Sequence, residues 1–242
     1  MNGVELTIRF AYIVNFLRYC GPKCASEQFL EYFNKKISQE EALSLLKKFE
    51  GLHVYLEALS EKSGQPYASD QAAEAYWIGN ELLDLFDNED MARIIHSLTK
   101  RGLPPSLAQR LISSMPNGLF PHHNFNVFYV GVGNTTGHVP TTLLTMDKCR
   151  ITSGTVKEVR ETTLLVSYAP LAFKENKLVF ASEKDIEVSY LPEMLASVRK
   201  GDTVALHWDF APVLLSEDQA NKIKQYSQLL MDRISFQALA DR

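Results

Sequence analysis

The spacing of apolar residues changes near Gly118, and this change constrains the fold more than any other feature of the sequence. From residue 4 to about 115, apolar residues recur every three or four positions, as they do on one face of a helix. After Gly118 they fall into short runs rich in Val, Thr, Tyr and Phe, with turn residues between the runs, as in strands. The sequence therefore predicts an α+β protein with an all-helical domain over residues 1–117 and a β-rich domain over residues 118–242.

Helix-start signals support the helical prediction for the N-terminal half. Ser38 and Glu41 have the spacing of a capping box at the start of one amphipathic segment that extends to Leu59. Ser69 precedes a further amphipathic segment, and Pro105 stands at a first-turn position, where proline is favoured. We therefore expect several helices that bury one face each.

The second half is expected to be a small, closed, OB-like β-barrel that ends in one helix, from Ser216 to about Phe236. Closure is expected because many short strands would otherwise leave unpaired edges. The expected strands lie at residues 124–133, 138–146, 149–159, 162–169, 177–182, 185–190 and 203–208.

Composition argues against several classes of protein. The chain of 242 residues has no apolar run near the ~20 residues that span a bilayer, and Glu5 and Arg9 interrupt its apolar start. We therefore expect a first helix rather than a signal peptide, and no membrane segment. A net charge of −4 without a Lys/Arg cluster predicts no nucleic-acid binding. Three cysteines are too few for a disulfide scaffold, which predicts reduced thiols and a cytoplasmic protein.

His207 fits its surroundings least. It follows the apolar run Val204–Leu206, where a buried strand would have another aliphatic residue. A single histidine on a strand is most often held by a backbone carbonyl, and a single buried cysteine most often acts as a small apolar residue. A functional role for His207 therefore needs a second residue placed to work with it.

Two segments of the second half resemble HypC/HupF-type hydrogenase maturation chaperones. In "KCRITSGTVKEV", Cys149 comes ahead of an apolar residue, Gly154 and Val156. In "GDTVALHWDFAPVLLSEDQANKIKQYSQLL", a Gly-Asp pair, a strand with His207, a Phe-Ala pair and an acidic helix start precede a long helix. The resemblance covers about residues 147–232. The whole chain also resembles an uncharacterised bacterial family that joins a helical first half to such a barrel.

The resemblance implies a function. Chaperones of this type take up an iron centre that bears cyanide and carbon monoxide, together with a maturation partner protein. They pass it to the large subunit of nickel–iron hydrogenase. Their cysteine is an iron ligand and their histidine lies close by, so the resemblance implies Cys149 as the thiolate ligand and His207 as the second site residue. Cys149 is internal, whereas the family's cysteine becomes the mature N-terminus, so ligation through a free α-amino group is excluded here.

This pair of residues suits the implied chemistry. A thiolate is a soft ligand for such iron, and imidazole also binds iron well. A protonated His207 is further expected to lower the pKa of the Cys149 thiol. Two protein ligands leave the metal shell incomplete, as a carrier requires. We expect the sulfur and an imidazole nitrogen to meet within about 5 Å, at an accessible rim of the barrel.

Other residues define two alternatives. His122 and His123 lie at the junction of the two halves, where clefts commonly form, and an extended backbone would allow only one of them into a given site. If either histidine acts together with the carboxylate of Glu50 or Glu74, the protein is expected to be an enzyme with its site in an interdomain cleft. The other alternative is a protein-binding adaptor without metal. We expect a carrier rather than an enzyme.

Cys20 and Cys24 stand on either side of Gly-Pro, with one residue more between them than in a thioredoxin-type motif. That motif belongs between a strand and a helix, whereas this segment lies between two expected helices. The Gly-Pro pair is therefore interpreted as the stop of the first helix.

Overall fold

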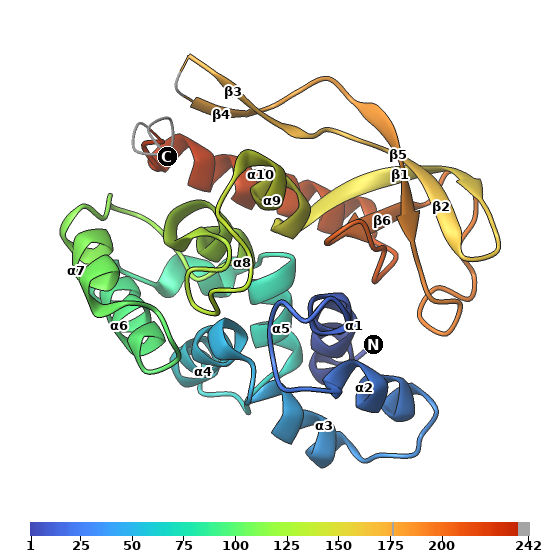
Figure 1. Ribbon diagram of the computed structural model, residues 1–242, viewed down its shortest axis with the longest axis horizontal. Coiled ribbons are helices and arrows are strands. Elements are labelled where there is room, and N and C mark those ends of the chain that lie inside the picture. The colour runs from blue at the N-terminus through green and yellow to red at the C-terminus, as the bar shows by residue number, and fades with distance from the viewer. Residues whose placement is uncertain (176, 237–242) are drawn as a thin grey trace.

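The structure is a computed structural model that describes residues 1–175 and 177–236. Helices form the chain as far as Cys149, short strands follow, and one long helix comes last (Figure 1). The helical part consists of α1 (Gly3–Phe16), α2 (Ala25–Phe33), α3 (Gln39–Leu46), α4 (Glu50–Ser63), α5 (Asp70–Trp77), the 3-10 helix η1 (Glu81–Leu85), α6 (Asn88–Thr99), α7 (Pro105–Ser113), α8 (His123–Phe125), the π-helix η2 (Asn126–Gly131) and α9 (Leu143–Cys149).

The predicted helix starts are confirmed where capping residues defined them. Ser38 and Glu41 form the capping box of α3, and the Ser69 side chain accepts a hydrogen bond at the start of α5. The amphipathic segment that begins at Ser38 is two helices rather than one. The chain leaves helical geometry at Phe49, whose backbone is extended and whose buried ring stacks on Phe29.

The predicted closed barrel is wrong for the part of the chain that the structure describes. The strands form a four-stranded antiparallel sheet in the order β5-β2-β1-β6 and a separate hairpin, β3-β4. Only an isolated bridge between Ser189 and Phe210 connects the end of β5 to the segment after β6. The hairpin lies along the last helix instead of completing a wall (Figure 1). The strand bounds are β1 (Thr152–Val159), β2 (Thr163–Tyr168), β3 (Leu171–Lys174), β4 (Lys177–Phe180), β5 (Lys184–Ser189) and β6 (Thr203–Leu206).

The strands predicted at 124–133 and 138–146 are also wrong, because the first segment is helical as far as Gly131 and the second is irregular as far as Thr142 and helical from Leu143. Nearly every residue from Leu119 to Val132 is buried, so the alternation there did not mark one buried and one exposed face. Helix α9 begins at a capping box between Thr142 and Thr145, which explains why helix replaces strand at this point.

The last helix, α10 (Glu217–Arg233), joins the helical and sheet parts. It begins at Ser216 as predicted and contacts β1, β4, β6 and α8. One continuous cluster of buried apolar residues includes members of both parts. The predicted division between residues 117 and 118 stays a prediction, and the change from helix to strand comes later, after Cys149.

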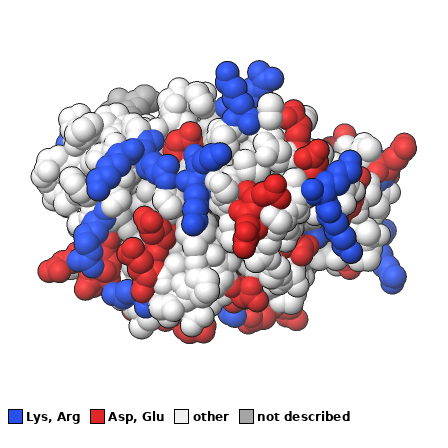
Figure 2. All heavy atoms as spheres, turned by 90° about the horizontal axis from the view of Figure 1, so that it is seen from below, with Lys and Arg blue, Asp and Glu red and all other residues white. Residues whose placement is uncertain are grey.

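One face of the molecule has no simple charge pattern. On the face drawn in Figure 2, basic and acidic side chains lie next to one another among neutral residues. Over residues 1–175 and 177–236, no helix has the length and apolar character needed to cross a bilayer. Cytoplasmic location and the absence of nucleic-acid binding stay predictions.

Candidate metal centre

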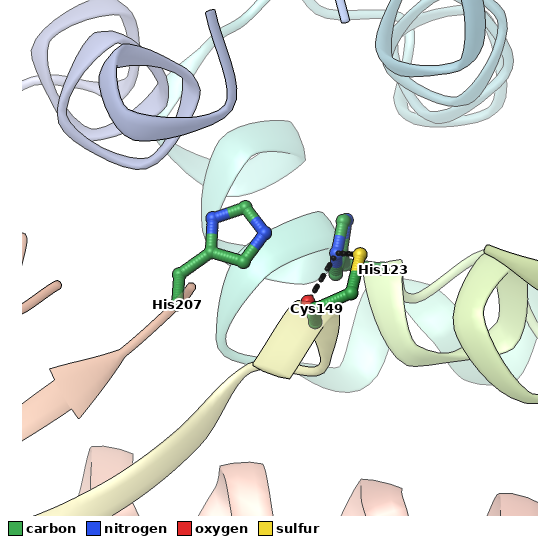
Figure 3. A group of neighbouring side chains, drawn as sticks. All are labelled: His123, Cys149 and His207. Carbon is green, nitrogen blue, oxygen red and sulfur yellow. Dashed lines mark hydrogen bonds between the residues drawn. The ribbon is translucent and has the colours of Figure 1, made fainter. Parts of the chain in front are cut away.

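Three side chains that could bind a metal ion meet where the helical and sheet parts join. One ligand atom each from His123, Cys149 and His207 lies within 4.8 Å of the other two (Figure 3). His123 begins α8, Cys149 ends α9, and His207 follows β6 directly. The structure therefore brings together the two residues that the resemblance implied and one of the two junction histidines.

The imidazole of His207 is fixed by a carbonyl of the first helix. Its Nδ1 lies 3.1 Å from the carbonyl oxygen of Phe10 in α1. Because a carbonyl only accepts, Nδ1 carries the proton and Nε2 has a free lone pair. That Nε2 is buried and has no hydrogen-bond partner among the described residues. In Figure 3 one ring nitrogen of His207 points toward Cys149 and His123, as a metal ligand would.

His123 is held from both sides. Its Nε2 lies 3.0 Å from the Cys149 carbonyl oxygen and 3.8 Å from the Cys149 sulfur, and its Nδ1 lies 3.1 Å from the Tyr76 hydroxyl. Nε2–H therefore donates to the carbonyl, and the Tyr76 hydroxyl donates to Nδ1. Coordination through Nε2 would move the ring proton to Nδ1, which would then donate to Tyr76. Such an outer partner fixes the orientation of a ligating histidine.

Aromatic rings pack around these imidazoles. Trp77 in α5 stacks on Phe10, with ring centroids 4.7 Å apart, and on His123, at 4.9 Å. The rings of His123 and His207 meet edge to face at 5.1 Å. Well-packed rings have few alternative rotamers, so the ligand atoms are held in place before any metal arrives.

The turn after β6 aligns His207 with Cys149. Trp208 and Asp209 both have left-handed backbones, with φ of 54° each, which non-glycine residues adopt at a cost of ~1–3 kcal/mol. The Trp208 amide donates to the carbonyl of Lys148 at 2.6 Å, and Lys148 forms an ion pair with Asp209. These contacts tie the segment that contains His207 to the segment that contains Cys149.

Asn124 fastens the same region from the helical side. Its side-chain amide donates to the Ile151 carbonyl at 2.9 Å and to the Ser227 hydroxyl at 2.7 Å. Its side-chain oxygen accepts from the Ile151 amide at 2.7 Å. Asn124 is fully buried, and it therefore links α8, the start of the sheet and α10 next to the cluster.

Burial sets the protonation of all three candidate ligands. It lowers the pKa of His123 to about 4 and lowers the pKa of His207 well below its usual value. Burial also raises the pKa of the Cys149 thiol to about 12, which the neighbouring Trp208 indole opposes. The expectation that a protonated His207 lowers the pKa of Cys149 is wrong, because His207 is neutral at physiological pH.

A small cavity leads to the cluster. It has a volume of about 80 Å³, and its lining includes all three candidate ligands. Cys149 is 8% exposed and His207 1%, so the ligands lie at the buried inner end, not at the accessible rim expected from the sequence. The partly exposed residues of the lining form the outer end. They are Tyr19, Cys20, Gly51, Asn126, Gly133, Thr135, Thr136 and Val139.

The residues of the alternative enzyme site lie in different surroundings. His122 caps α8, accepting from the Asn124 amide at 3.0 Å, and its ring stacks on Tyr226 rather than lining the cavity. The Glu50 carboxylate accepts hydrogen bonds from Cys20 and from the backbone beside it, and Glu74 accepts one from Asn80.

Cys20 and Cys24 are both free thiols and do not form a disulfide with each other. Cys20 lies beside Glu50, and Cys24 is exposed at the start of α2, where it has a left-handed backbone with φ of 62°.

Sequence reasoning named His123 only as a cleft residue and missed its place beside Cys149. It also missed Tyr76 and Phe10, which orient the two imidazoles. A backbone carbonyl leaves no trace in a sequence, so the contribution of Phe10 could not have been found. The segment "PHHNF", in which one histidine caps a helix that the other begins, is the signal that could have placed His123.

The fold and the cluster define a mixed helix-and-sheet protein with a buried His–Cys–His candidate metal site. The chain belongs to the family described as "Family of unknown function (DUF6390)", whose model matches residues 1–240. Neither the curated proteins nor the solved structures contain a significant match to it.

Proposed function

We propose that this protein is a carrier that takes up a metal centre between His123, Cys149 and His207 and passes it to another protein. The observation that supports this most is the buried Nε2 of His207, which has no hydrogen-bond partner among the described residues. A buried polar atom without a partner is unfavourable by ~1–3 kcal/mol. A metal ion bound to Nε2 would remove that penalty.

The donor set suits a transition metal. One thiolate and two neutral imidazoles are ligands that iron, copper and zinc accept. With ordinary bond lengths, neighbouring ligand atoms of a tetrahedral metal lie roughly 3.3–3.6 Å apart. The present separations of up to 4.8 Å would therefore need side-chain movements of only about 1 Å. Three protein ligands leave one position open on a tetrahedral metal and three on an octahedral one, which suits transient binding of a metal that brings ligands of its own.

The cargo and the client follow from the resemblance of residues 147–232 alone. We propose an iron centre that bears cyanide and carbon monoxide, received with a hydrogenase maturation partner and delivered to the large subunit of nickel–iron hydrogenase. The elements on which the resemblance depends occur in the expected order, with β6, then His207, then α10. The cavity of about 80 Å³ has room for a few diatomic ligands on a bound metal.

The test is co-production of the protein with hydrogenase maturation partners, followed by anaerobic purification. Iron content and the infrared bands of bound cyanide and carbon monoxide are measured. We expect one iron per chain in the wild type and loss of iron in Cys149→Ala and His207→Ala. Cys24→Ala is the matched control and should load normally, because Cys24 is exposed and outside the cluster.

A thermal denaturation curve for each variant separates loss of the site from loss of the fold. Normal iron loading of the Cys149→Ala protein would refute the proposal. A second arm measures binding of Co²⁺ alone to the isolated protein. If Co²⁺ binds through Cys149 but no iron is acquired on co-production, the metal site stands and the proposed cargo and client are wrong.

A further inference from the structure

Both tryptophans of the chain line the cavity that leads to the candidate metal ligands. Trp77 comes from the end of α5 and stacks on His123, whereas Trp208 follows His207 and packs against Tyr19 at the outer end. Two segments distant in the sequence therefore place the same kind of hydrogen-bond donor in one small space.

The indole N–H groups of both residues are buried and make no hydrogen bond of normal distance and angle, although that of Trp208 lies near enough to the Cys149 sulfur to lower the pKa of the thiol. Trp77 is 2% exposed and Trp208 8%, and neither Nε1 atom has a hydrogen-bond partner among the described residues. An indole nitrogen can only donate, and an unused buried donor is unfavourable by ~1–3 kcal/mol. Among residues 1–175 and 177–236, six buried side-chain atoms have no partner, and three of them, these two and His207 Nε2, belong to this cavity lining. Such a concentration points to a ligand with acceptor atoms.

The charges around the cavity restrict what that ligand can be. No Asp, Glu, Lys or Arg side chain is part of the described cavity lining. A free anion there would lack a counter-charge, and burying an unpaired charge is strongly unfavourable. A divalent metal bound to one thiolate and two neutral imidazoles has a net charge of plus one. A monoanion on the open position of that metal would make the buried assembly neutral.

We propose that Trp77 and Trp208 donate hydrogen bonds to the outer atoms of a small monoanion bound to the metal that His123, Cys149 and His207 hold. This inference rests on the proposed metal site and adds to it the class of ligand that completes the metal shell. The anion replaces a water on the metal, and its outer atoms accept from the indoles. The cavity of about 80 Å³ limits the ligand to a few heavy atoms.

The experiment uses Co²⁺ as the metal and azide as the anion, with the full-length protein. The absorption spectrum of Co²⁺ reports metal binding and its change on adding azide. Fluorescence gives a second signal, because both tryptophans lie in the cavity. Trp77→Phe and Trp208→Phe keep an aromatic ring and remove the N–H. Tyr19→Phe is the matched control, since it changes a rim residue of the same cavity without removing an indole.

We expect each tryptophan variant to bind azide about tenfold more weakly than the wild type, the loss of one charge-assisted hydrogen bond. Azide affinity is measured with each variant saturated with Co²⁺, because Trp77 also stacks on His123 and Trp208 lies beside Cys149, so both substitutions are expected to weaken Co²⁺ binding as well. Tyr19→Phe should match the wild type, and metal-free protein should not bind azide.

Two results would overturn this inference while leaving the metal site standing. One is equal azide affinity in the wild type and both tryptophan variants. The other is wild-type protein whose Co²⁺ spectrum does not respond to azide, which would mean that the indoles donate hydrogen bonds only to water. Failure of the wild type to bind Co²⁺ would instead refute the metal site, and the anion site with it.

Discussion

Metal uptake by this site should release one proton per metal ion over a wide pH range. The Cys149 thiol has a pKa raised to about 12, so it is protonated at every pH from 6 to 9. The pKa of His123 is lowered to about 4 and that of His207 is also well below its usual value, so both imidazoles are neutral there. Only the thiol must lose a proton when the metal binds.

The size of the pH effect on metal affinity follows from these pKa values. At pH 7 the thiol lies about five units below its pKa, so deprotonation opposes binding by about 7 kcal/mol. Raising the pH by one unit removes about 1.4 kcal/mol of that cost, so the association constant should rise about tenfold per unit. Between pH 6 and pH 8 we therefore expect an increase of about 100-fold.

The assay is competition for Zn²⁺ between the protein and a chelator of known protonation behaviour, at half-unit steps of pH from 6 to 9. The quantity compared is the slope of the logarithm of the Zn²⁺ association constant against pH. Cys24→Ser is the control and should give the same slope as the wild type. A slope that approaches three near pH 6 would mean that the histidines are protonated, and a slope that falls to zero by pH 9 would mean an ordinary thiol. Either result would refute this account of the buried site.

Three further predictions concern residues that support the site. Tyr76→Phe should weaken Zn²⁺ binding about 10- to 100-fold by equilibrium titration while the protein stays folded, since only the partner of the imidazole is lost; unchanged affinity would contradict this. Asn124→Ala should lower the free energy of unfolding, measured by urea denaturation, by about 3–5 kcal/mol, because three buried hydrogen bonds are lost. A loss below about 1 kcal/mol would be evidence that Asn124 does not link α8, the sheet and α10. Gly133→Ala should lower the melting temperature, since φ is 75° and a Cβ would lie 1.9 Å from the Val139 carbonyl oxygen. The matched control is Gly137→Ala, with φ of 74° but nothing within 4 Å of its Cβ, which should lower it less.

Short-range signals allowed part of the fold to be predicted. The capping residues at Ser38, Ser69 and Ser216 marked helix starts because they satisfy backbone donors within a few residues of themselves. The strands β1, β2 and β4–β6 likewise lay where β-branched and aromatic runs predicted them. Prediction failed for the segment 124–133, which is buried on nearly all sides. A segment that is buried on nearly all sides is mostly apolar whatever its backbone conformation, so its composition does not distinguish a π-helix from a strand.

Barrel closure was a prediction about long-range pairing, and the sequence contained no register information to support it. Whether the hairpin β3-β4 extends the main sheet or lies on α10 depends on contacts between segments far apart in the chain. The candidate site, too, could be predicted only in part. The proximity of Cys149 and His207 could be expected from a resemblance, and their metal-binding role stays a prediction. The addition of His123 depends on how α8 meets the end of α9, a contact between distant segments; the local segment "PHHNF" marks only the start of α8.

The helical part is what makes this cluster different from a cysteine and a histidine on a sheet. The Phe10 carbonyl of α1 fixes the tautomer of His207, and α5 supplies both the Tyr76 partner and the Trp77 stack for His123. Without α1, Nε2 of His207 would have no reason to be the unprotonated nitrogen. Without α8, the third ligand would be missing. Cys149 at the end of α9 and His207 after β6 supply two of the ligand atoms, whereas the protonation of these ligands, their orientation and the closure of the cavity depend on the helices that precede α9.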